Sequence, residues 1–153
     1  MDAATAQARS DLDRLAVMAT LHCLSGCALG EIAGMAIGEA LGWSDVAQMA
    51  LAIALAYTFG FSLTAMPLVR SGLPAGQIVT TALAADTVSI TIMEAIDNLV
   101  VLLIPGAFAA GLGDPLFYGS ILLGFAIAFP FAFLVNRRLI ARGGGHALVH
   151  QHH

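Results

Sequence analysis

Sulfur and carboxylate side chains recur every four residues in an apolar stretch near the amino terminus. They belong to Cys23, Cys27, Glu31, Met35 and Glu39. Residues four apart lie on one face of a helix, so a helix here would present them in a single line. Thiolate and thioether groups are soft ligands that suit Cu(I), and thiolate also suits zinc. The spacing is therefore compatible with a site for a transition-metal ion such as copper or zinc.

His22 and Glu31 extend this argument beyond simple packing. Cysteine and methionine also fill apolar cores, so Cys23 and Cys27 alone leave both the ligand and the packing interpretation open. His22 adds an imidazole about 100° around the helix from Cys23. A carboxylate at bilayer depth costs about 2.5 kcal/mol or more unless it is paired, protonated or hydrated. We therefore expect Glu31 to point toward a polar interior.

A second apolar stretch, at about 76–104, carries acidic residues of its own. Asp86, Glu94 and Asp97 lie within it, and no arginine or lysine lies at similar depth to pair them. The two stretches are expected to cross the membrane in the same direction. Counted from the side on which both begin, Asp86 should lie at the depth of Cys23, and Glu94 at the depth of Glu31. Such a cluster must hold cations, protons or water. The predicted metal ligands are His22, Cys23, Cys27, Glu31, Met35, Asp86, Met93 and Glu94, and Ser89, Asp97 and Asn98 form a candidate polar path.

Glycines form a second line beside the sulfur and carboxylate side chains. They are Gly26, Gly30, Gly34 and Gly38. Overlapping GxxxG spacing lets a neighbouring helix approach closely in a membrane. The sequence does not show whether this face meets another helix of the same chain or a second subunit.

Four apolar stretches must position these residues. They lie at about 15–41, 44–69, 76–104 and 116–141, and each exceeds the roughly 20 residues that span a bilayer. The chain is 59% hydrophobic and 10% charged, whereas soluble domains carry about 25% charged residues. The stretches lack strand alternation, so we predict an all-α, polytopic four-helix bundle formed by a single domain over residues 1–153. Asp114 should cap the last helix, with Pro115 in its first turn.

Arginine placement predicts the orientation. The six arginines precede the first stretch, separate the second from the third, or end the fourth: Arg9, Arg14, Arg70, Arg137, Arg138 and Arg142. The other two connections contain neither arginine nor lysine. By the positive-inside rule, both termini lie in the cytoplasm, and we expect a multi-pass protein of a bacterial inner membrane.

The carboxyl terminus, residues 143–153, is rich in histidine after three glycines. Histidine-rich segments bind metals, so this tail is a secondary candidate site on the cytoplasmic side. Its candidate ligands are His146, His150, His152 and His153. The interrupted run differs from a purification tag, and we interpret it as a native tail.

Several motifs together resemble a small bacterial four-helix membrane family that is catalogued as a domain of unknown function. They are His22-Cys23-x-x-Gly26-Cys27-x-x-Gly30-Glu31, the Ala84–Ile90 run, Met93-Glu94-x-x-Asp97-Asn98, Asp114-Pro115, Asn136-Arg137, Gly145-His146-Ala147 and His152-His153. The resemblance extends from about Leu15 to the end of the chain. It implies a membrane architecture and a native histidine tail, and it implies no established activity.

Three functions fit these residues. The first is transport or handling of a transition-metal cation, with copper favoured and zinc the other candidate. The second is a proton- or cation-conducting subunit, in which the thiols only pack. The third is a structural or assembly subunit of a larger membrane complex. An enzyme is less expected, because phosphate-loop, nucleotide-fingerprint, HExxH and nucleophile-elbow motifs are missing from the sequence. A membrane redox enzyme stays open as an alternative, because His, Glu and Asp in a helical bundle can hold a metal ion. Four helices leave little room for a transport path within one subunit, so we expect a homo-oligomer in the lipid bilayer. The absence of a basic patch argues against nucleic-acid binding.

Overall fold

The protein is all-helical in the computed structural model, which describes residues 3–70, 72 and 74–142. The elements are α1 (Ala3–Ala40), α2 (Asp45–Arg70), α3 (Ala75–Leu103), the short 3-10 helix η1 (Ala107–Ala109) and α4 (Pro115–Ala141). The described residues contain no strand. The predicted all-α class is therefore confirmed.

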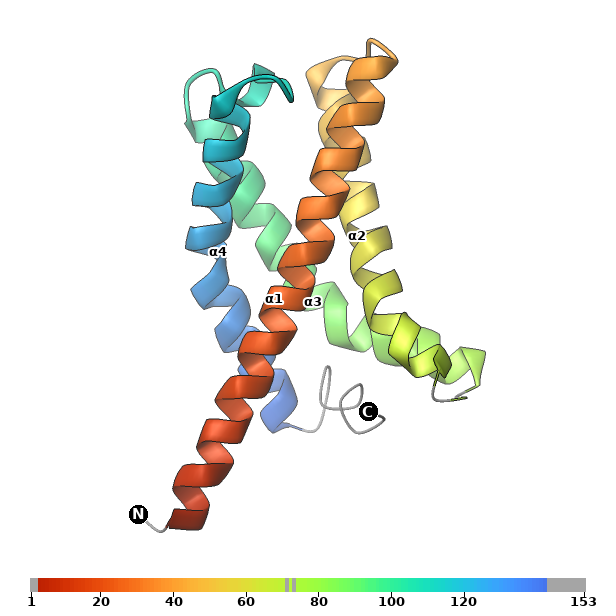
Figure 1. Cartoon of the computed structure of the whole chain (residues 1–153), viewed down its shortest axis with the longest axis vertical. Coiled ribbons are helices and arrows are strands. Elements are labelled where there is room, and N and C mark those ends of the chain that lie inside the picture. Colours follow the sequence, from red (N-terminus) through yellow and green to blue (C-terminus); the bar gives the residue numbers. More distant parts are fainter. Residues whose placement is uncertain (1–2, 71, 73, 143–153) are drawn as a thin grey trace.

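The helices form an elongated bundle (Figure 1). α1 runs diagonally through the front, α2 lies beside its second half, and α4 lies on the other side, while α3 crosses behind. The α1–α2 turn and η1 lie at one end of the bundle. The start of α1, the α2–α3 turn and the end of α4 lie toward the opposite end.

α1 begins well before the apolar stretch that was predicted for it. It starts at Ala3, whereas the apolar stretch starts at about Leu15. Hydropathy marks the part of a helix that suits lipid, and a helix can continue into water beyond it. Leu12 and Leu15 pack on a small cluster with Ile140 of α4, which stabilises this first part of α1. The other helix ends lie within about a residue of their predicted positions.

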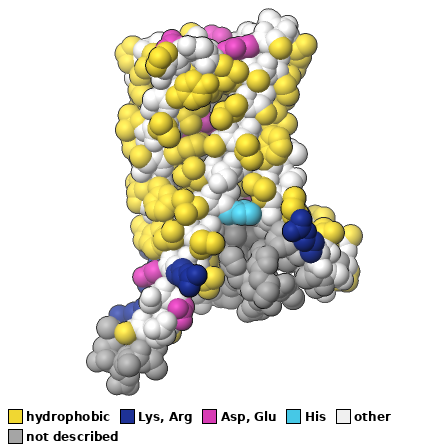
Figure 2. All heavy atoms as spheres, viewed as in Figure 1, with side chains coloured by type: hydrophobic (Ala, Val, Ile, Leu, Met, Phe, Trp, Pro, Cys, Tyr) yellow, Lys and Arg dark blue, Asp and Glu magenta, His cyan; other side chains and the backbone are white. Residues whose placement is uncertain are grey.

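Three helices are long and apolar enough to cross a membrane. They comprise Ala6–Ala40 of α1, Asp45–Met66 of α2 and Pro115–Ala141 of α4, within the described part of the chain. Large apolar side chains are exposed on every long helix, among them Leu29, Val69, Leu102 and Leu122. Figure 2 shows such side chains over most of one face, with charged groups mainly near its two ends. This surface suits lipid and not water.

The glycine line of α1 packs against α2. An ideal Cβ at Gly26 would lie 2.7 Å from the Cα of Gly60, and one at Gly30 would overlap the backbone of Ala56. Close approach of the two backbones therefore requires glycine at these positions. The open question of the partner is answered: these glycines face a helix of the same chain.

Two carboxylates organise the end of the bundle that carries η1. The Asp114 side chain accepts a hydrogen bond of 2.8 Å from the backbone N–H of Leu116, and Pro115 is the first residue of α4, as predicted. Glu39 of α1 accepts a hydrogen bond of 2.7 Å from the backbone N–H of Leu112. Glu39 thereby ties the connection between α3 and α4 to the end of α1.

Candidate functional site

Four acidic side chains from α1 and α3 are buried inside the bundle. The exposed fractions are 6% for Glu31, 0% for Asp86, 4% for Glu94 and 1% for Asp97. Between residues 15 and 136 the only arginine is Arg70, at the end of α2, and the chain has no lysine. The helical stretches that carry these acids therefore contain neither arginine nor lysine, so in a membrane other groups must compensate any charge on them.

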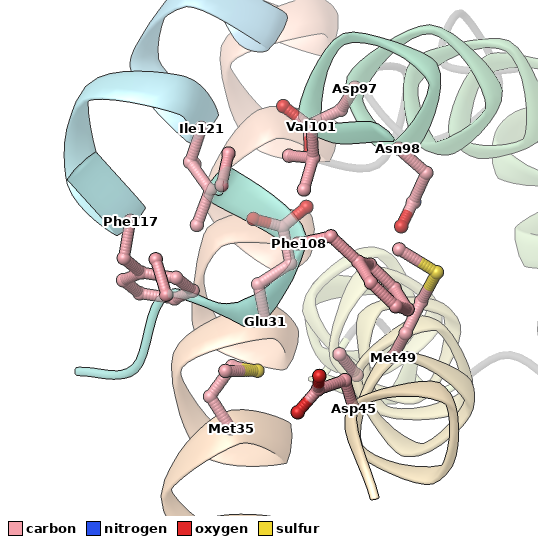
Figure 3. A pocket seen from close by; sticks show the side chains of 13 residues that line it. Glu31, Met35, Asp45, Met49, Asp97, Asn98, Val101, Phe108, Phe117 and Ile121 are labelled. Atoms are coloured by element: carbon pink, nitrogen blue, oxygen red, sulfur yellow. The ribbon is translucent and has the colours of Figure 1, made fainter. Parts of the chain in front are cut away.

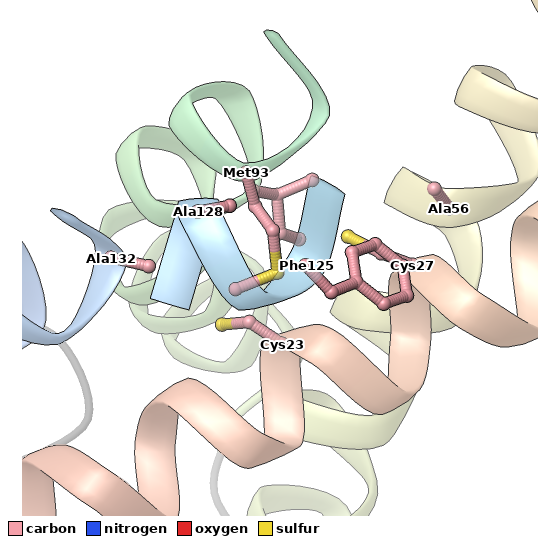
Figure 4. Close-up of a cluster of buried hydrophobic side chains, with 8 residues drawn as sticks. Cys23, Cys27, Ala56, Met93, Phe125, Ala128 and Ala132 are labelled. Atoms are coloured by element: carbon pink, nitrogen blue, oxygen red, sulfur yellow. The ribbon is translucent and has the colours of Figure 1, made fainter. Parts of the chain in front are cut away.

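Each cysteine lies beside one of these acids. The Cys23 thiol donates to a carboxylate oxygen of Asp86, with 3.8 Å between sulfur and oxygen, and Cys27 interacts with the Glu94 side chain. Figure 4 shows both sulfurs within the core cluster, where Met93 projects from α3 toward α1. The predicted proximity of Asp86 and Cys23 is confirmed, and Glu94 lies near Glu31, as predicted, and also near Cys27.

Glu31 and Asp97 form an acidic pair at the junction of α1, α3 and α4. Their carboxyl groups lie close enough to interact, and neither Glu31 oxygen nor Asp97 Oδ1 has a hydrogen-bond partner among the described residues. The Asp97 side chain packs over Gly124 of α4, where an added Cβ would lie 2.8 Å from the Asp97 Cγ. Two carboxylates contain no donor for one another, so a proton, water or a cation must lie between them.

A cavity leads from this acidic pair toward the end of the bundle that carries η1. It has about 50 Å³ of internal space, enough for a few water molecules. Figure 3 shows the labelled side chains that surround it, from all four long helices and η1. Its polar and sulfur-bearing lining residues are Glu31, Met35, Asp45, Met49, Asp97 and Asn98.

Buried polar groups continue in the opposite direction along α1. Thr20 accepts a hydrogen bond of 3.0 Å from the Asn136 side-chain amide, and both residues are fully buried. Thr20, Cys23, Cys27 and Glu31 occupy successive turns of α1. These turns cover about 17 Å at 1.5 Å per residue, which is more than half of the hydrocarbon thickness.

A family model described as "Domain of unknown function (DUF4396)" matches residues 14–145. The chain belongs to this family. The match includes the apolar part of α1, all of α2, α3 and α4, and thus every acid of the site. The predicted membership of a domain of unknown function is confirmed. Searches of curated proteins and of solved structures found no match to this DUF4396 chain.

The DUF4396 fold brings most of the predicted site residues into the interior, in two parts. Cys23, Asp86, Ser89 and Met93 are buried toward the start of α1, and Cys27, Glu31, Glu94 and Asp97 are buried nearer its end. His22 and Asn98 are half-buried, and Met35 lines the cavity.

No metal centre is evident among the described residues. Nowhere among them do three or more His, Cys, Asp or Glu side chains form a group that could hold a metal ion. Metal binding therefore stays a prediction. The tail ligands His146, His150, His152 and His153 lie outside the described residues.

Sequence reasoning missed several residues of the site. Asp45 and Met49 line the cavity, and Thr20 and Asn136 form a hydrogen bond between α1 and α4. A buried asparagine in an apolar helix was a usable signal, since its amide needs a partner in lipid. A single methionine in an apolar helix carried no such signal.

Proposed function

We propose that this protein conducts protons across a membrane along its buried acidic residues. The observation that carries the proposal is the pair of Glu31 and Asp97, whose carboxyl groups interact without a hydrogen-bond donor between them in the described part of the chain. A proton held between the two would supply that donor and remove one buried charge.

Groups able to take part in proton transfer continue from this pair in both directions. On one side the cavity has room for water and is lined by Asp45 near its mouth. On the other side lie the Glu94 and Cys27 pair and then the Asp86 and Cys23 pair. A chain of carboxyl groups, thiols and water is the kind of relay that membrane proteins use for protons.

The proposal includes four membrane spans with both termini in the cytoplasm of a bacterial cell. α3 has 29 residues, long enough to span, and its three acids face the interior. The described arginines lie in or beside the polar first part of α1, at the end of α2 and at the end of α4, and Figure 1 places these segments toward one end of the bundle. This distribution supports a cytoplasmic location for that end.

Proton flux into vesicles tests the proposal. Purified protein is reconstituted with a pH-sensitive dye inside the vesicles, and an imposed potential of 100 mV supplies about 2.3 kcal/mol per proton. We expect flux above that of empty vesicles, lost in Glu31→Gln and retained in Asp11→Asn. Asp11 is an exposed acid in the polar first part of α1. Equal flux for Glu31→Gln and the unaltered chain would refute the role of the acidic pair.

Transition-metal transport is the second candidate, with copper as the favoured ion and zinc as the other. The soft donors of the core support it, because the Cys23 and Cys27 thiols and the Met93 thioether lie in one buried cluster and sulfur is a favoured ligand for Cu(I). Elemental analysis of gently purified protein and metal flux in the same vesicles test this candidate. Metal flux that is lost in a Cys23→Ala/Cys27→Ala double variant, from a chain that shows no proton flux above that of empty vesicles, would favour metal over protons.

We further propose that the protein acts as a homo-oligomer. Four helices leave only a narrow interior, and the exposed apolar surfaces of every long helix offer area for a second copy in the bilayer. Native mass spectrometry from detergent measures the number of chains directly. A strict monomer that still conducts would overturn this proposal and would leave proton conduction standing.

A further inference from the structure

The cavity at the end of the bundle that carries η1 combines strong negative charge with apolar walls. Its charged lining residues are all acidic, namely Glu31, Asp45 and Asp97. Most of the other lining side chains are apolar, and they include the phenyl ring of Phe108 and the thioether of Met49. A preferred ligand must therefore carry both a positive charge and apolar groups.

The environment of the Glu31 side chain is stronger evidence for a ligand than the negative charge of the cavity is. Only 6% of Glu31 is exposed, and neither of its carboxylate oxygens has a hydrogen-bond partner among the residues that the structure describes. Figure 3 shows its carboxyl group directed into the space between α1, α3 and the η1 segment. A buried, unpartnered carboxylate at the inner end of a cavity is a ready acceptor for a cation that carries N–H donors.

The composition of the walls selects among cations. A bare metal ion needs several close ligands, and no group of three His, Cys, Asp or Glu side chains around this cavity is arranged to supply them. A small alkylammonium ion needs fewer charged ligands than a metal ion, because its N–H groups bond to carboxylates while its alkyl carbons contact thioethers and phenyl faces. The internal space of about 50 Å³ limits such an ion to a few heavy atoms.

We propose that this cavity binds a small alkylammonium cation, with the ammonium group on Glu31 and Asp97 and the alkyl group against Met35, Met49 and Phe108. The site is entered from the end of the bundle opposite the start of α1. Asp45, which is exposed at that end, attracts the cation to the entrance. The inference does not rest on proton conduction, because a binding site can exist in a protein that conducts nothing.

Isothermal titration of the full chain in detergent tests the inference with chosen probes. The probes are methylammonium, ethylammonium, potassium, ethanol as the neutral counterpart of ethylammonium, and tetraethylammonium as an ion too large for the space. We expect saturable binding of the first two, binding of potassium weaker by about tenfold or more, and none of ethanol or tetraethylammonium. In Glu31→Gln the affinity for methylammonium should fall by about tenfold to a hundredfold, and in Asp11→Asn it should not change.

Several results would overturn the inference. Absence of saturable methylammonium and ethylammonium binding would do so, and so would equal affinity for potassium, which would indicate a site for inorganic cations. An unchanged affinity in Glu31→Gln would exclude the assigned carboxylate. If that variant does not fold, the probe series on the unaltered chain still decides. Proton flux in vesicles is a separate measurement, so the failure of one proposal is distinguishable from the failure of the other.

Discussion

Replacing Gly30 with alanine tests whether α1 and α2 pack as closely as described. The new Cβ would lie 2.7 Å from the carbonyl carbon of Leu55 and would overlap the Ala56 backbone N and Cα. These are main-chain atoms, so no side-chain rotation can relieve the overlap, and the two helices must separate. For the same reason, Ala56→Gly should not rescue the variant.

The expected loss of stability follows from two opposing terms. Overpacking against a rigid neighbour costs about 1–3 kcal/mol, and contact with main-chain atoms favours the upper end of that range. Alanine gains up to about 1 kcal/mol over glycine inside a helix. The net destabilisation of Gly30→Ala should therefore be about 2 kcal/mol.

A matched glycine separates packing from helix propensity. Gly119 also lies within a long helix, α4, and a Cβ there would meet no atom within 4 Å. Gly119→Ala should be neutral or stabilise the protein by up to about 1 kcal/mol. At Gly38, by contrast, the new Cβ would lie 2.5 Å from the Gln48 side-chain Cγ, which can move, so Gly38→Ala should cost less than Gly30→Ala.

Unfolding in mixed micelles with increasing SDS measures these free energies. Trp43, the single tryptophan, lies at the turn between α1 and α2, so its fluorescence reports the separation of these two helices. If Gly30→Ala proves as stable as the unaltered chain, or if Gly119→Ala loses as much, the close α1–α2 contact is wrong.

Three further substitutions probe the contacts that position α4. Asp114→Ala removes the cap of α4 and should cost about 1 kcal/mol in the same SDS titration, while Asp114→Asn should cost less because it keeps an acceptor. Asn136→Ala removes the buried hydrogen bond to Thr20 and should cost about 0.6–1.7 kcal/mol, with Thr20→Val giving a similar loss and the double variant losing less than the sum. Arg137→Gln breaks the ion pair with Asp13, and because both side chains are half-exposed (37% and 50%) its loss should stay below about 1 kcal/mol and shrink further in high salt.

Sequence patterns predicted the helices and the interior acids because both follow from the cost of polar groups in lipid. The cap at Asp114 and Pro115 was predictable from local chemistry alone, and the depth match of Asp86 with Cys23 followed from counting residues along parallel helices. Counting also placed Glu94 near Glu31, but it did not give the contact of Glu94 with Cys27, which depends on how α3 crosses α1. Crossing geometry depends on packing between helices, which a single sequence does not specify.

The dependence on packing between helices also explains which features of the site the sequence did not predict. The glycine spacing predicted a close contact, but its partner, α2, emerged only from the fold. The cavity depends on Asp45 and Met49 of α2 approaching Glu31 of α1 and Asp97 of α3. Its shape is therefore a property of three helices together and has no signature in any one of them.

The helix α1 is longer than the hydrocarbon layer of a membrane is thick. At 38 residues, α1 rises about 57 Å, nearly twice the hydrocarbon thickness, and no proline interrupts it. A stiff rod of this kind transmits tilt from one end to the other. Because Glu31 lies on α1 and Asp97 on α3, any tilt of α1 against α3 would change the spacing of these two acids.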